Sequence, residues 1–258
     1  MAAADPGRGR GAGLARSLGV ARSLLIYYGQ PWRLRAQSRL YRDFVGPGEL
    51  AFDIGAHVGN RTRSLRRLGA RVLAIEPQPS LAALLRRQFA GDPAVTVLAA
   101  AVGAAPGTAT MFASRRTPTV TTLSRGWIER VQRTPGFAGV AWQDATQVPV
   151  TTLDALIAQH GLPRFCKIDV EGFEAEVLAG LSRPLPALSL EYLPAAIDVA
   201  QAALERLGAL GTYRCNVTIG EAGRWLWPEW RDVAATSSWL AERRPEERSG
   251  DVWARLES

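Results

Sequence analysis

The stretch that decides the fold runs from residue 50 to residue 60 and reads Leu-Ala-Phe-Asp-Ile-Gly-Ala-His-Val-Gly-Asn. Its first five residues are a short, mostly apolar run that is typical of a buried β-strand. Two glycines follow, and then a segment with the apolar spacing of a helix, through Leu65 and Leu68. Glycines let the backbone approach a ligand, and a helix start offers unpaired N–H groups. The stretch therefore predicts a strand–turn–helix unit that holds a small ligand at its turn.

The spacing within this turn restricts the ligand. Gly55 and Gly59 form a Gly-x-x-x-Gly pattern, and Asp53 stands before the first glycine. A carboxylate at that position would repel a pyrophosphate, so the loop suits a dinucleotide poorly. An adenosyl ligand with a cationic amino acid end would suffer no such repulsion. The structural alternative is that Asp53 only ties down its own loop.

The rest of the chain alternates between strand-like and helix-like segments, which indicates an α/β fold with a mostly parallel sheet. The expected strands are 71–75, 94–99, 165–170, 187–192 and 213–219, and the expected helices are 80–89, 174–181 and 195–207. The intervening segment 103–148 is long and rich in Thr, Gly, Pro and Arg. We expect it to form a small β excursion or a lid.

Two further sites place charge at strand ends. Glu76, followed by Pro77, closes the second predicted strand, where a carboxylate can accept hydrogen bonds from a ribose diol. Lys167, Asp169 and Glu171 alternate along the fourth predicted strand and fall on one side of it. Burying charged groups at that edge of a sheet costs free energy, unless they bind a ligand, take part in catalysis or form ion pairs. A structural ion pair between Lys167 and one of the two acids is the alternative to a catalytic role.

The basic residues exclude several enzyme classes. Lys167 is the single lysine, and it lies between Cys166 and Ile168, so the chain has no phosphate-binding loop of the Gly-Lys-Ser/Thr type. The residue four positions before it is Pro163, which rules out a Tyr-x-x-x-Lys reductase pair. The two cysteines are too few for a disulfide framework and favour the cytoplasm as the compartment.

The net charge of +7 is concentrated at the start of the chain. Residues 1–48 contain eight arginines and two aspartates, whereas the remainder is almost neutral. We expect residues 1–48 to be a basic, partly disordered arm with an amphipathic helix from Leu14 to Tyr28, residues 49–238 to be the functional domain, and residues 239–258 to be a charged tail. The arm could contact an anionic membrane surface weakly. Motifs for nucleic-acid binding are lacking, and no nucleic-acid partner is predicted.

Read in order, these motifs resemble the FkbM-type family of S-adenosylmethionine-dependent methyltransferases. The resemblance covers about residues 50–192 and rests on Asp53 to Asn60, on Ala74-Ile75-Glu76-Pro77, on Thr152-Leu153-Asp154 and on Lys167-Ile168-Asp169-Val170-Glu171-Gly172. It implies a Rossmann-like class I methyltransferase fold with a seven-stranded, mostly parallel sheet. It also implies that S-adenosylmethionine is bound by the residues Asp53, Gly55, Ala56, His57, Gly59, Asn60, Glu76 and Pro77.

The resemblance further implies that Asp169 stands near the transferred methyl group. The predicted reaction is O-methylation of a hydroxyl on a sugar, a glycan- or lipid-linked molecule or a natural product, with Asp169 as the first candidate base and Glu171 as the second. Lys167 is the third residue of this catalytic group. His57 is expected to be a loop contact. With two histidines in the chain and no acidic group at ligand spacing, no metal is predicted.

Two other function classes compete with this interpretation. A nicotinamide-dependent oxidoreductase would share Glu76 and the sheet, and a non-catalytic adapter would keep the glycine loop for structure alone. We expect the acceptor pocket to be formed by the 103–148 excursion, including 117–124 and Trp127, together with Trp225, Trp227 and Trp230. The oligomeric state is left open by the sequence.

Overall fold

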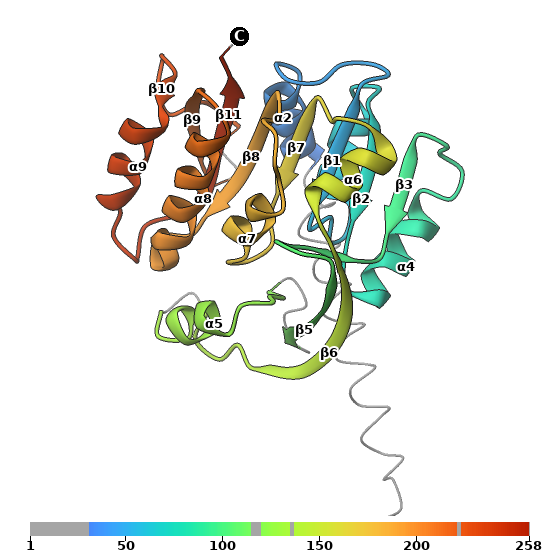
Figure 1. Cartoon of the computed structure of the whole chain (residues 1–258), viewed down its shortest axis with the longest axis horizontal. Coiled ribbons are helices and arrows are strands. Elements are labelled where there is room, and N and C mark those ends of the chain that lie inside the picture. The colour runs from blue at the N-terminus through green and yellow to red at the C-terminus, as the bar shows by residue number, and fades with distance from the viewer. Residues whose placement is uncertain (1–30, 115–119, 135–136, 221–222, 258) are drawn as a thin grey trace, which may run out of the picture.

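The computed structural model describes residues 31–114, 120–134, 137–220 and 223–257, and its centre is one twisted sheet (Figure 1). The sheet has eight strands in the order β10-β9-β11-β8-β7-β1-β2-β3. Five neighbouring strands are parallel: β3 (Val95–Leu98), β2 (Arg71–Ile75), β1 (Leu50–Ile54), β7 (Phe165–Ile168) and β8 (Ala187–Tyr192). Three strands extend it in antiparallel fashion: β11 (Gly250–Leu256), β9 (Tyr213–Ile219) and β10 (Arg231–Asp232).

Helices cover both faces of this sheet because each central strand buries side chains on both sides. On one face, Ala51, Val72 and Phe165 form a cluster with residues from α2 (Pro31–Tyr41) and α3 (Asn60–Arg66), and α4 (Pro79–Gln88) packs beside them. On the other face, Phe52 and Cys166 pack against α6 (Leu153–His160), α7 (Glu174–Ala179), α8 (Ile197–Leu210) and α9 (Val233–Ala241). A short 3₁₀ turn, η2 (Pro194–Ala196), precedes α8. The α/β class and the mostly parallel sheet are confirmed, and β10 adds a two-residue edge strand to the seven expected.

The expected β excursion is a second, three-stranded sheet below the carboxyl ends of the parallel strands (Figure 1). It contains β4 (Ala101–Val102), β5 (Gly107–Ser114) and β6 (Trp142–Thr151), and α5 (Arg125–Val131) lies between β5 and β6 in the chain. The hydroxyl of Ser124 caps α5 by accepting a hydrogen bond from the Trp127 backbone N–H at 3.1 Å. Trp127 itself is buried against Phe137 and Trp142. This cluster also contains Ala196 and is packed against by Leu193 and Val199, so it joins the excursion to the η2–α8 segment.

The prediction of a charged tail over residues 239–258 is wrong. Residues Gly250–Leu256 form β11, which lies between β8 and β9 inside the sheet. Trp253 is buried there, stacks on Phe165 and Phe44, and donates its indole N–H to Thr218 at 3.1 Å. An isolated strand has no partner in the local sequence, so its place in a sheet cannot be read from the charge of the residues before it.

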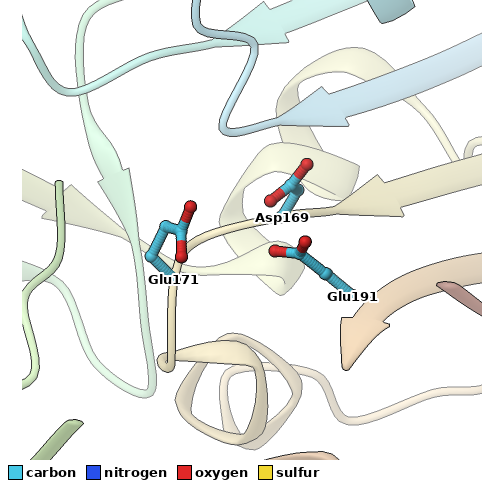
Figure 2. A group of neighbouring side chains, drawn as sticks. All are labelled: Asp169, Glu171 and Glu191. Carbon is cyan, nitrogen blue, oxygen red and sulfur yellow. The ribbon is translucent and has the colours of Figure 1, made fainter. Parts of the chain in front are cut away.

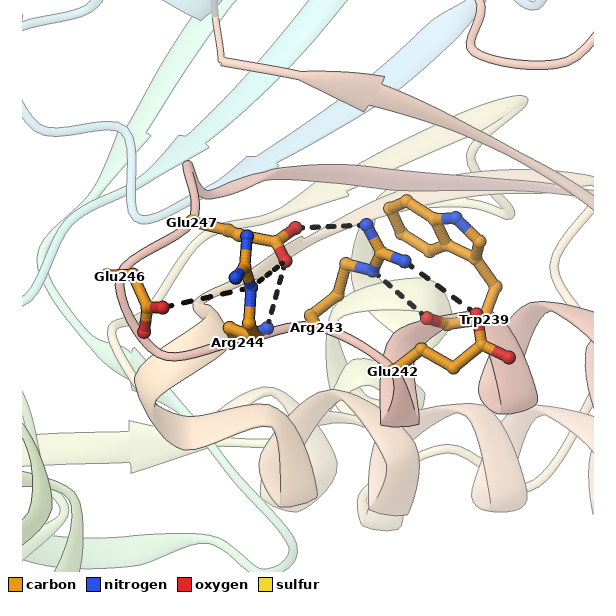
Figure 3. A network of polar contacts seen from close by, with 6 residues as sticks. All are labelled: Trp239, Glu242, Arg243, Arg244, Glu246 and Glu247. Carbon is orange, nitrogen blue, oxygen red and sulfur yellow. Dashed lines mark hydrogen bonds and ion pairs between the residues drawn. The ribbon is translucent and has the colours of Figure 1, made fainter.

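The charged residues that suggested a tail form a local network of polar contacts just after α9 (Figure 3). Arg243 lies over the ring of Trp239 at 4.3 Å, pairs with Glu247 at 2.9 Å, and donates to the Trp239 carbonyl at 3.2 Å. Arg244 contacts Glu246 and Glu247. These contacts hold the turn that leads the chain from α9 back into β11.

The first domain boundary also differs from the prediction. Tyr41, Phe44 and Val45, which fall in the predicted arm, are buried against the sheet, and Tyr41 meets Phe165 edge-on at 5.3 Å. Residues 31–48 therefore belong to the domain. The predicted helix from Leu14 to Tyr28 lies outside the described residues. Within the part of the chain that the structure describes, no helix has the length and apolar character needed to cross a membrane.

Candidate active site

The site is built on one row of residues across four parallel strands. The strand register places Ile75, Ile54, Ile168 and Leu190 side by side, as the last aligned row of β2, β1, β7 and β8. The residues that directly follow these four are, in the same order, Glu76, Gly55, Asp169 and Glu191. Carboxyl ends of parallel strands meet at one edge of the sheet, where such folds bind ligands. Three carboxylates and one glycine therefore face the same opening.

Gly55 is required by the backbone that faces it. Its φ is +78°, and a Cβ atom there would lie 1.8 Å from the carbonyl oxygen of Asp169. A side chain would thus push apart the ends of β1 and β7. Gly59 has a φ of +84°, and its Cβ would come within 2.7 Å of Leu85. Both glycines are therefore required by the packing of the turn itself, whether or not a ligand approaches them.

Glu76 holds this turn and also lines the opening. Its carboxylate accepts hydrogen bonds from the backbone N–H groups of His57 at 2.9 Å and Gln78 at 2.8 Å. Burial raises the pKa of Glu76 to about 7, against the lowering effect of these two hydrogen bonds. Carboxylates accept more than one hydrogen bond per oxygen, so Glu76 retains capacity for a ligand.

His57 is a loop residue and not a proton carrier in this geometry. Its backbone lies in the left-handed region with a φ of +49°. Burial lowers the pKa of its ring to about 4, although the charge of Asp169 opposes the shift. The imidazole is therefore neutral at physiological pH, which agrees with the expected loop contact.

Asp53 lies beneath the opening and is fully buried. The hydroxyl of Thr62 donates a hydrogen bond of 2.6 Å to its carboxylate. Burial raises the pKa of Asp53, and the charge of Lys167 works against that shift. Asp53 therefore ties β1 to α3 through one carboxylate oxygen, and its other oxygen is buried without a hydrogen-bond partner among the described residues.

Lys167 and Asp169 form a close ion pair. The Lys167 ammonium lies 2.5 Å from the Asp169 carboxylate, and the two side chains are 1% and 30% exposed. Burial alone would raise the pKa of Asp169, but the adjacent ammonium outweighs burial and lowers it. Lys167 is below the surface of the opening, so it fixes the position and charge of Asp169 from behind.

Glu171 is presented by a strained turn after β7. Its φ is +53°, which is uncommon for a residue with a side chain. The hydroxyl of Thr122, from the excursion, donates to the Glu171 carbonyl at 2.6 Å. The buried carboxylate of Glu174 accepts from the N–H groups of Val170 and Gly172, each at 3.1 Å. The excursion and α7 together hold Glu171 in this conformation.

Asp169, Glu171 and Glu191 form an acidic cluster (Figure 2). One carboxylate oxygen from each lies within 4.8 Å of the others. Burial and the negative neighbours raise the pKa of both Glu171 and Glu191 well above the usual range. Such oxygens are also the ligands that hard divalent cations prefer. The absence of a metal remains a prediction.

The sequence motifs do not point to Glu191, because it is far from Asp169 along the chain. The missing information was the pairing of β7 with β8, in which Lys167 lies opposite Ser189 and Ile168 opposite Leu190. Continuing that register by one residue sets Asp169 beside Glu191. The available signal was Glu191 within Leu-Ser-Leu-Glu-Tyr, because Glu76 likewise follows the apolar residues of β2.

A cavity opens over this row of residues. Of the predicted cofactor-binding residues, Gly55, His57, Asn60, Glu76 and Pro77 line it. Asp53, Ala56 and Gly59 lie outside its lining. The remaining walls include Arg61, Gln78, Ala100, Ala101, Val102, Thr121, Leu123, Asp169, Val170, Glu171, Phe173 and Glu191. The small apolar residues after β3 thus form one wall, and the excursion forms another.

The tryptophans near the end of the chain do not line this cavity, so that prediction is wrong. Trp225 and Trp230 pack against Phe44, and Trp227 packs against Trp239. They fill the core around β9 and β11. Of the other predicted pocket residues, Thr121 and Leu123 line the cavity. Residues 117–119 lie outside the described residues.

The family of the chain follows from a comparison with known proteins. The model of the methyltransferase FkbM domain matches residues 53–238. The chain belongs to the FkbM methyltransferase family. This methyltransferase uses S-adenosylmethionine as its methyl donor, and the oxidoreductase and adapter interpretations lose their support. A search of curated proteins found no match.

The solved structures that match the chain include methyltransferases. A putative O-methyltransferase from Klebsiella pneumoniae is 11% identical, with a TM-score of 0.47 and coverage of 100% of this chain and 93% of the other. An O-methyltransferase from Bacillus cereus in complex with SAH is 13% identical, with a TM-score of 0.46 and coverage of 93% and 90%. Precorrin-6y C5,15-methyltransferase from Geobacter metallireducens is 13% identical, with a TM-score of 0.45 and coverage of 88% and 89%.

The residues of the cavity fit this cofactor chemically. S-adenosylmethionine carries a cationic sulfonium and an ammonium group, and acids dominate the charged residues of the cavity. Glu76 can accept hydrogen bonds from a ribose diol, and Ala100 to Val102 offer an apolar wall to an adenine ring. Arg61 also lines the cavity, and its charge is complementary to the carboxylate of the amino acid end. The cofactor, when bound, supplies an electrophilic methyl group.

Proposed function

We propose that this methyltransferase O-methylates a hydroxyl group, on a sugar, a glycan- or lipid-linked molecule or a natural product, with Asp169 as the first proton acceptor. The observation that carries the proposal is the position of Asp169. It lies in the cavity row between Gly55 and Glu191, and Lys167 holds it at 2.5 Å from behind. A carboxylate fixed in this way can align a hydroxyl for in-line attack.

The acidic cluster supplies a destination for the proton. Methyl transfer to a hydroxyl forms an oxygen–carbon bond, breaks the sulfur–carbon bond and releases the hydroxyl proton. In our proposal the proton reaches Asp169, which the ion pair with Lys167 keeps ionised, whereas the raised pKa values of Glu171 and Glu191 favour their protonated forms. A cluster with oxygens within 4.8 Å of one another can hold one proton without further movement of the chain.

We propose the cofactor roles of individual residues on the same geometry. Glu76 binds the ribose, Pro77 and Ala100 to Val102 border the adenine, and the turn containing Gly55, His57 and Asn60 borders the methionine part. Ala56, Gly59 and Asp53 act by shaping that turn. Lys167 is a positioning residue for Asp169, since its ammonium is buried.

The cellular compartment is proposed from the two cysteines and from the charge at the start of the chain. The two buried free cysteines, Cys166 and Cys215, suit a reducing compartment such as the cytoplasm. A weak contact of residues 1–48 with an anionic membrane surface remains part of the proposal, because of the arginines there. No described feature favours a nucleic-acid partner.

The experiment that tests the proposal replaces Asp169 with Asn. Methyl transfer from tritiated S-adenosylmethionine is measured against a panel of sugars, glycolipids and phenolic alcohols, with and without EDTA. We expect loss of turnover by about a thousandfold, with the affinity for S-adenosylhomocysteine changed less than about fivefold. Asp154→Asn is the matched control, since Asp154 accepts from the Ser182 N–H away from the cavity. Unchanged turnover in Asp169→Asn would contradict the role of Asp169, and loss of activity in EDTA would show a metal requirement.

A further inference from the structure

A hollow at the ends of α2 and α3 lies apart from the active-site cavity. It is lined by Ser38, Arg39, Arg42, Arg67 and Leu68, and we call it the arginine hollow. α3 begins beside the active-site cavity, and Arg67 and Leu68 follow its last residue, just before β2. The seven residues of α3 span about 10 Å, so the arginine hollow lies toward the opposite edge of the sheet. None of its lining residues lines the active-site cavity, and the function described so far does not use it.

The charge of the arginine hollow is one-sided. Three of its lining residues are arginines, and among the described residues that form it there is no acidic side chain. The side chains of Arg39, Arg42 and Arg67 are exposed, and none of them makes an ion pair or a hydrogen bond with a residue in the described part of the chain. The neighbouring Arg66 differs, because it binds both carboxylate oxygens of Asp92, at 2.7 and 3.0 Å. Like charges around one hollow repel one another, and a bound anion would relieve that repulsion.

The two helices that carry these arginines are joined by buried polar and apolar contacts. The Ser38 hydroxyl donates to the Ser64 carbonyl at 3.3 Å, and the Ser64 hydroxyl donates to the side-chain oxygen of Gln37 at 3.4 Å. Leu40 of α2 and Leu65 of α3 belong to the same apolar cluster. The backbone positions of the arginines are therefore fixed relative to one another, and folding itself brings the three positive charges to one hollow.

The number of guanidinium groups indicates the class of anion. A guanidinium presents a planar fork of N–H donors that matches the oxygens of a carboxylate or a phosphate. A carboxylate has two oxygens and a single charge, whereas a phosphate monoester has three terminal oxygens and close to two charges at neutral pH. Three arginines around one hollow therefore suit a phosphate group best. The hollow has a volume of about 340 Å³ and is open to solvent, which leaves room for the molecule that carries the phosphate.

We propose that the arginine hollow is a second binding site of this protein, and that it takes the phosphate group of a phosphorylated small molecule or of an anionic lipid head group. The proposal does not depend on the methyl acceptor, because it uses none of the residues of the active-site cavity. Arg39 lies in the last turn of α2, and Arg67 ends α3, where a positive charge also complements the helix dipole. That role alone requires no ligand, so ligand binding separates the two interpretations.

The first test measures the binding of a free anion. The full chain, saturated with S-adenosylhomocysteine, is titrated with inorganic phosphate and with acetate by calorimetry. The arginines of the hollow are changed together in one variant, Arg39→Gln/Arg42→Gln/Arg67→Gln. The matched control removes the same charge from three exposed arginines outside the hollow, Arg86→Gln/Arg133→Gln/Arg183→Gln. We expect the hollow variant to bind phosphate at least about tenfold more weakly than the parent, and the control less than about threefold more weakly. Acetate should bind the parent at least about tenfold more weakly than phosphate.

The second test identifies the source of the phosphate group. Sedimentation is compared between vesicles of phosphatidylcholine alone and vesicles that also contain phosphatidylglycerol. Loss of binding to the mixed vesicles in the hollow variant, and not in the control, would assign the site to a lipid head group. Loss of phosphate binding with unchanged sedimentation would assign it to a soluble phosphorylated molecule. Equal losses in the two variants, no loss in either test, or equal binding of acetate and phosphate would overturn the proposal. Retained affinity for S-adenosylhomocysteine shows that each variant is folded, and the role of Asp169 is judged separately by turnover.

Discussion

The parallel half of the sheet and its antiparallel half are built from similar strands but differ in what they present at their edges. The parallel strands β2, β1, β7 and β8 reach the same edge of the sheet. Glu76, Gly55, Asp169 and Glu191 lie at that edge and line a cavity. The antiparallel strands β11 and β9 bury the aromatic side chains of Trp253 and Tyr213 instead, and no residue of β11, β9 or β10 lines that cavity. The difference follows from strand direction, because only parallel strands bring several carboxyl ends to one edge.

Residues of the antiparallel half thus stabilise the fold, whereas residues at the edge of the parallel half are proposed to bind the cofactor. If this division is correct, changes in the antiparallel half should lower stability without altering a folded site. Changes in the carboxylates of the row, at Glu76, Asp169 and Glu191, should alter binding without a comparable loss of stability. The four predictions below test this separation, beginning with the largest expected effect.

The largest effect is expected from Trp253→Ala. Trp253 is buried between β8 and β9 and contacts the aromatic rings of Tyr41, Phe44, Phe165 and Trp225. Its removal leaves a large cavity, so the free energy of unfolding should fall by about 3–5 kcal/mol. Urea denaturation measures the loss. Leu162→Ala, at a side chain that is 47% exposed, is the control and should change the free energy by less than about 0.5 kcal/mol.

The second effect concerns Glu76→Ala in the parallel half. Two hydrogen bonds from a ribose diol to a carboxylate would be lost, so the affinity for S-adenosylhomocysteine should fall by about a hundredfold or more. Calorimetric titration measures this change, and NAD serves as the negative control ligand. A variant that binds S-adenosylhomocysteine as tightly as the parent protein would remove Glu76 from the site.

The third effect is a pH dependence of cofactor affinity. The pKa of Glu76 is raised to about 7 by burial, and ribose binding uses the ionised carboxylate. The affinity for S-adenosylhomocysteine should therefore fall by about tenfold as the pH is lowered from about 8 to about 6. Glu76→Gln should bind more weakly and lose most of this dependence. A pH profile shared by both proteins would assign the titration to another group.

The same raised pKa has the opposite consequence for folding in the absence of ligand. A carboxyl with a higher pKa in the folded state than in the unfolded state favours folding while it is protonated. Its contribution is fully present below the unfolded value of 4.5 and is lost as the pH rises through about 7. Affinity and stability should therefore change in opposite directions between these pH values.

The smallest effect is expected from Arg243→Ala in the network after α9 (Figure 3). Arg243 has a partly exposed side chain that pairs with Glu247 and covers the ring of Trp239. Loss of these contacts should lower the free energy of unfolding by about 1 kcal/mol. Thermal unfolding in low and high salt measures the change, and the cofactor affinity should stay constant. Arg244→Ala, with a more exposed side chain, should have a smaller effect.

Local sequence predicted the strands that lead to the cavity, because their signals lie close together along the chain. The turn from Asp53 to Asn60 and the acid at Glu76 each follow an apolar strand, and the strands lie where expected. The ion pair of Lys167 and Asp169 was predicted as an alternative to catalysis, and the structure contains it. These features depend on alternation and on short loops, which a single sequence displays.

Other features depend on which strands become neighbours. The charged residues around Arg243 suggested a tail, yet the chain beyond them supplies β11 to the middle of the sheet. The tryptophans near 225–230 suggested a pocket, yet they pack against Phe44 and Trp239. In both cases the deciding contacts join residues that are distant in sequence, so local composition could not reveal them.

By itself, then, the sequence determined the α/β alternation, the glycine turn after β1 and the placement of Glu76, Asp169 and Glu171 after strands, because strand period and loop chemistry are local properties. Only the tertiary structure decided that Glu191 joins Asp169 and Glu171, and that all three carboxylates border one cavity. The reason is physical. The pairing of β7 with β8 is a long-range hydrogen-bonded register, and that register brings together side chains that nothing in the local sequence connects.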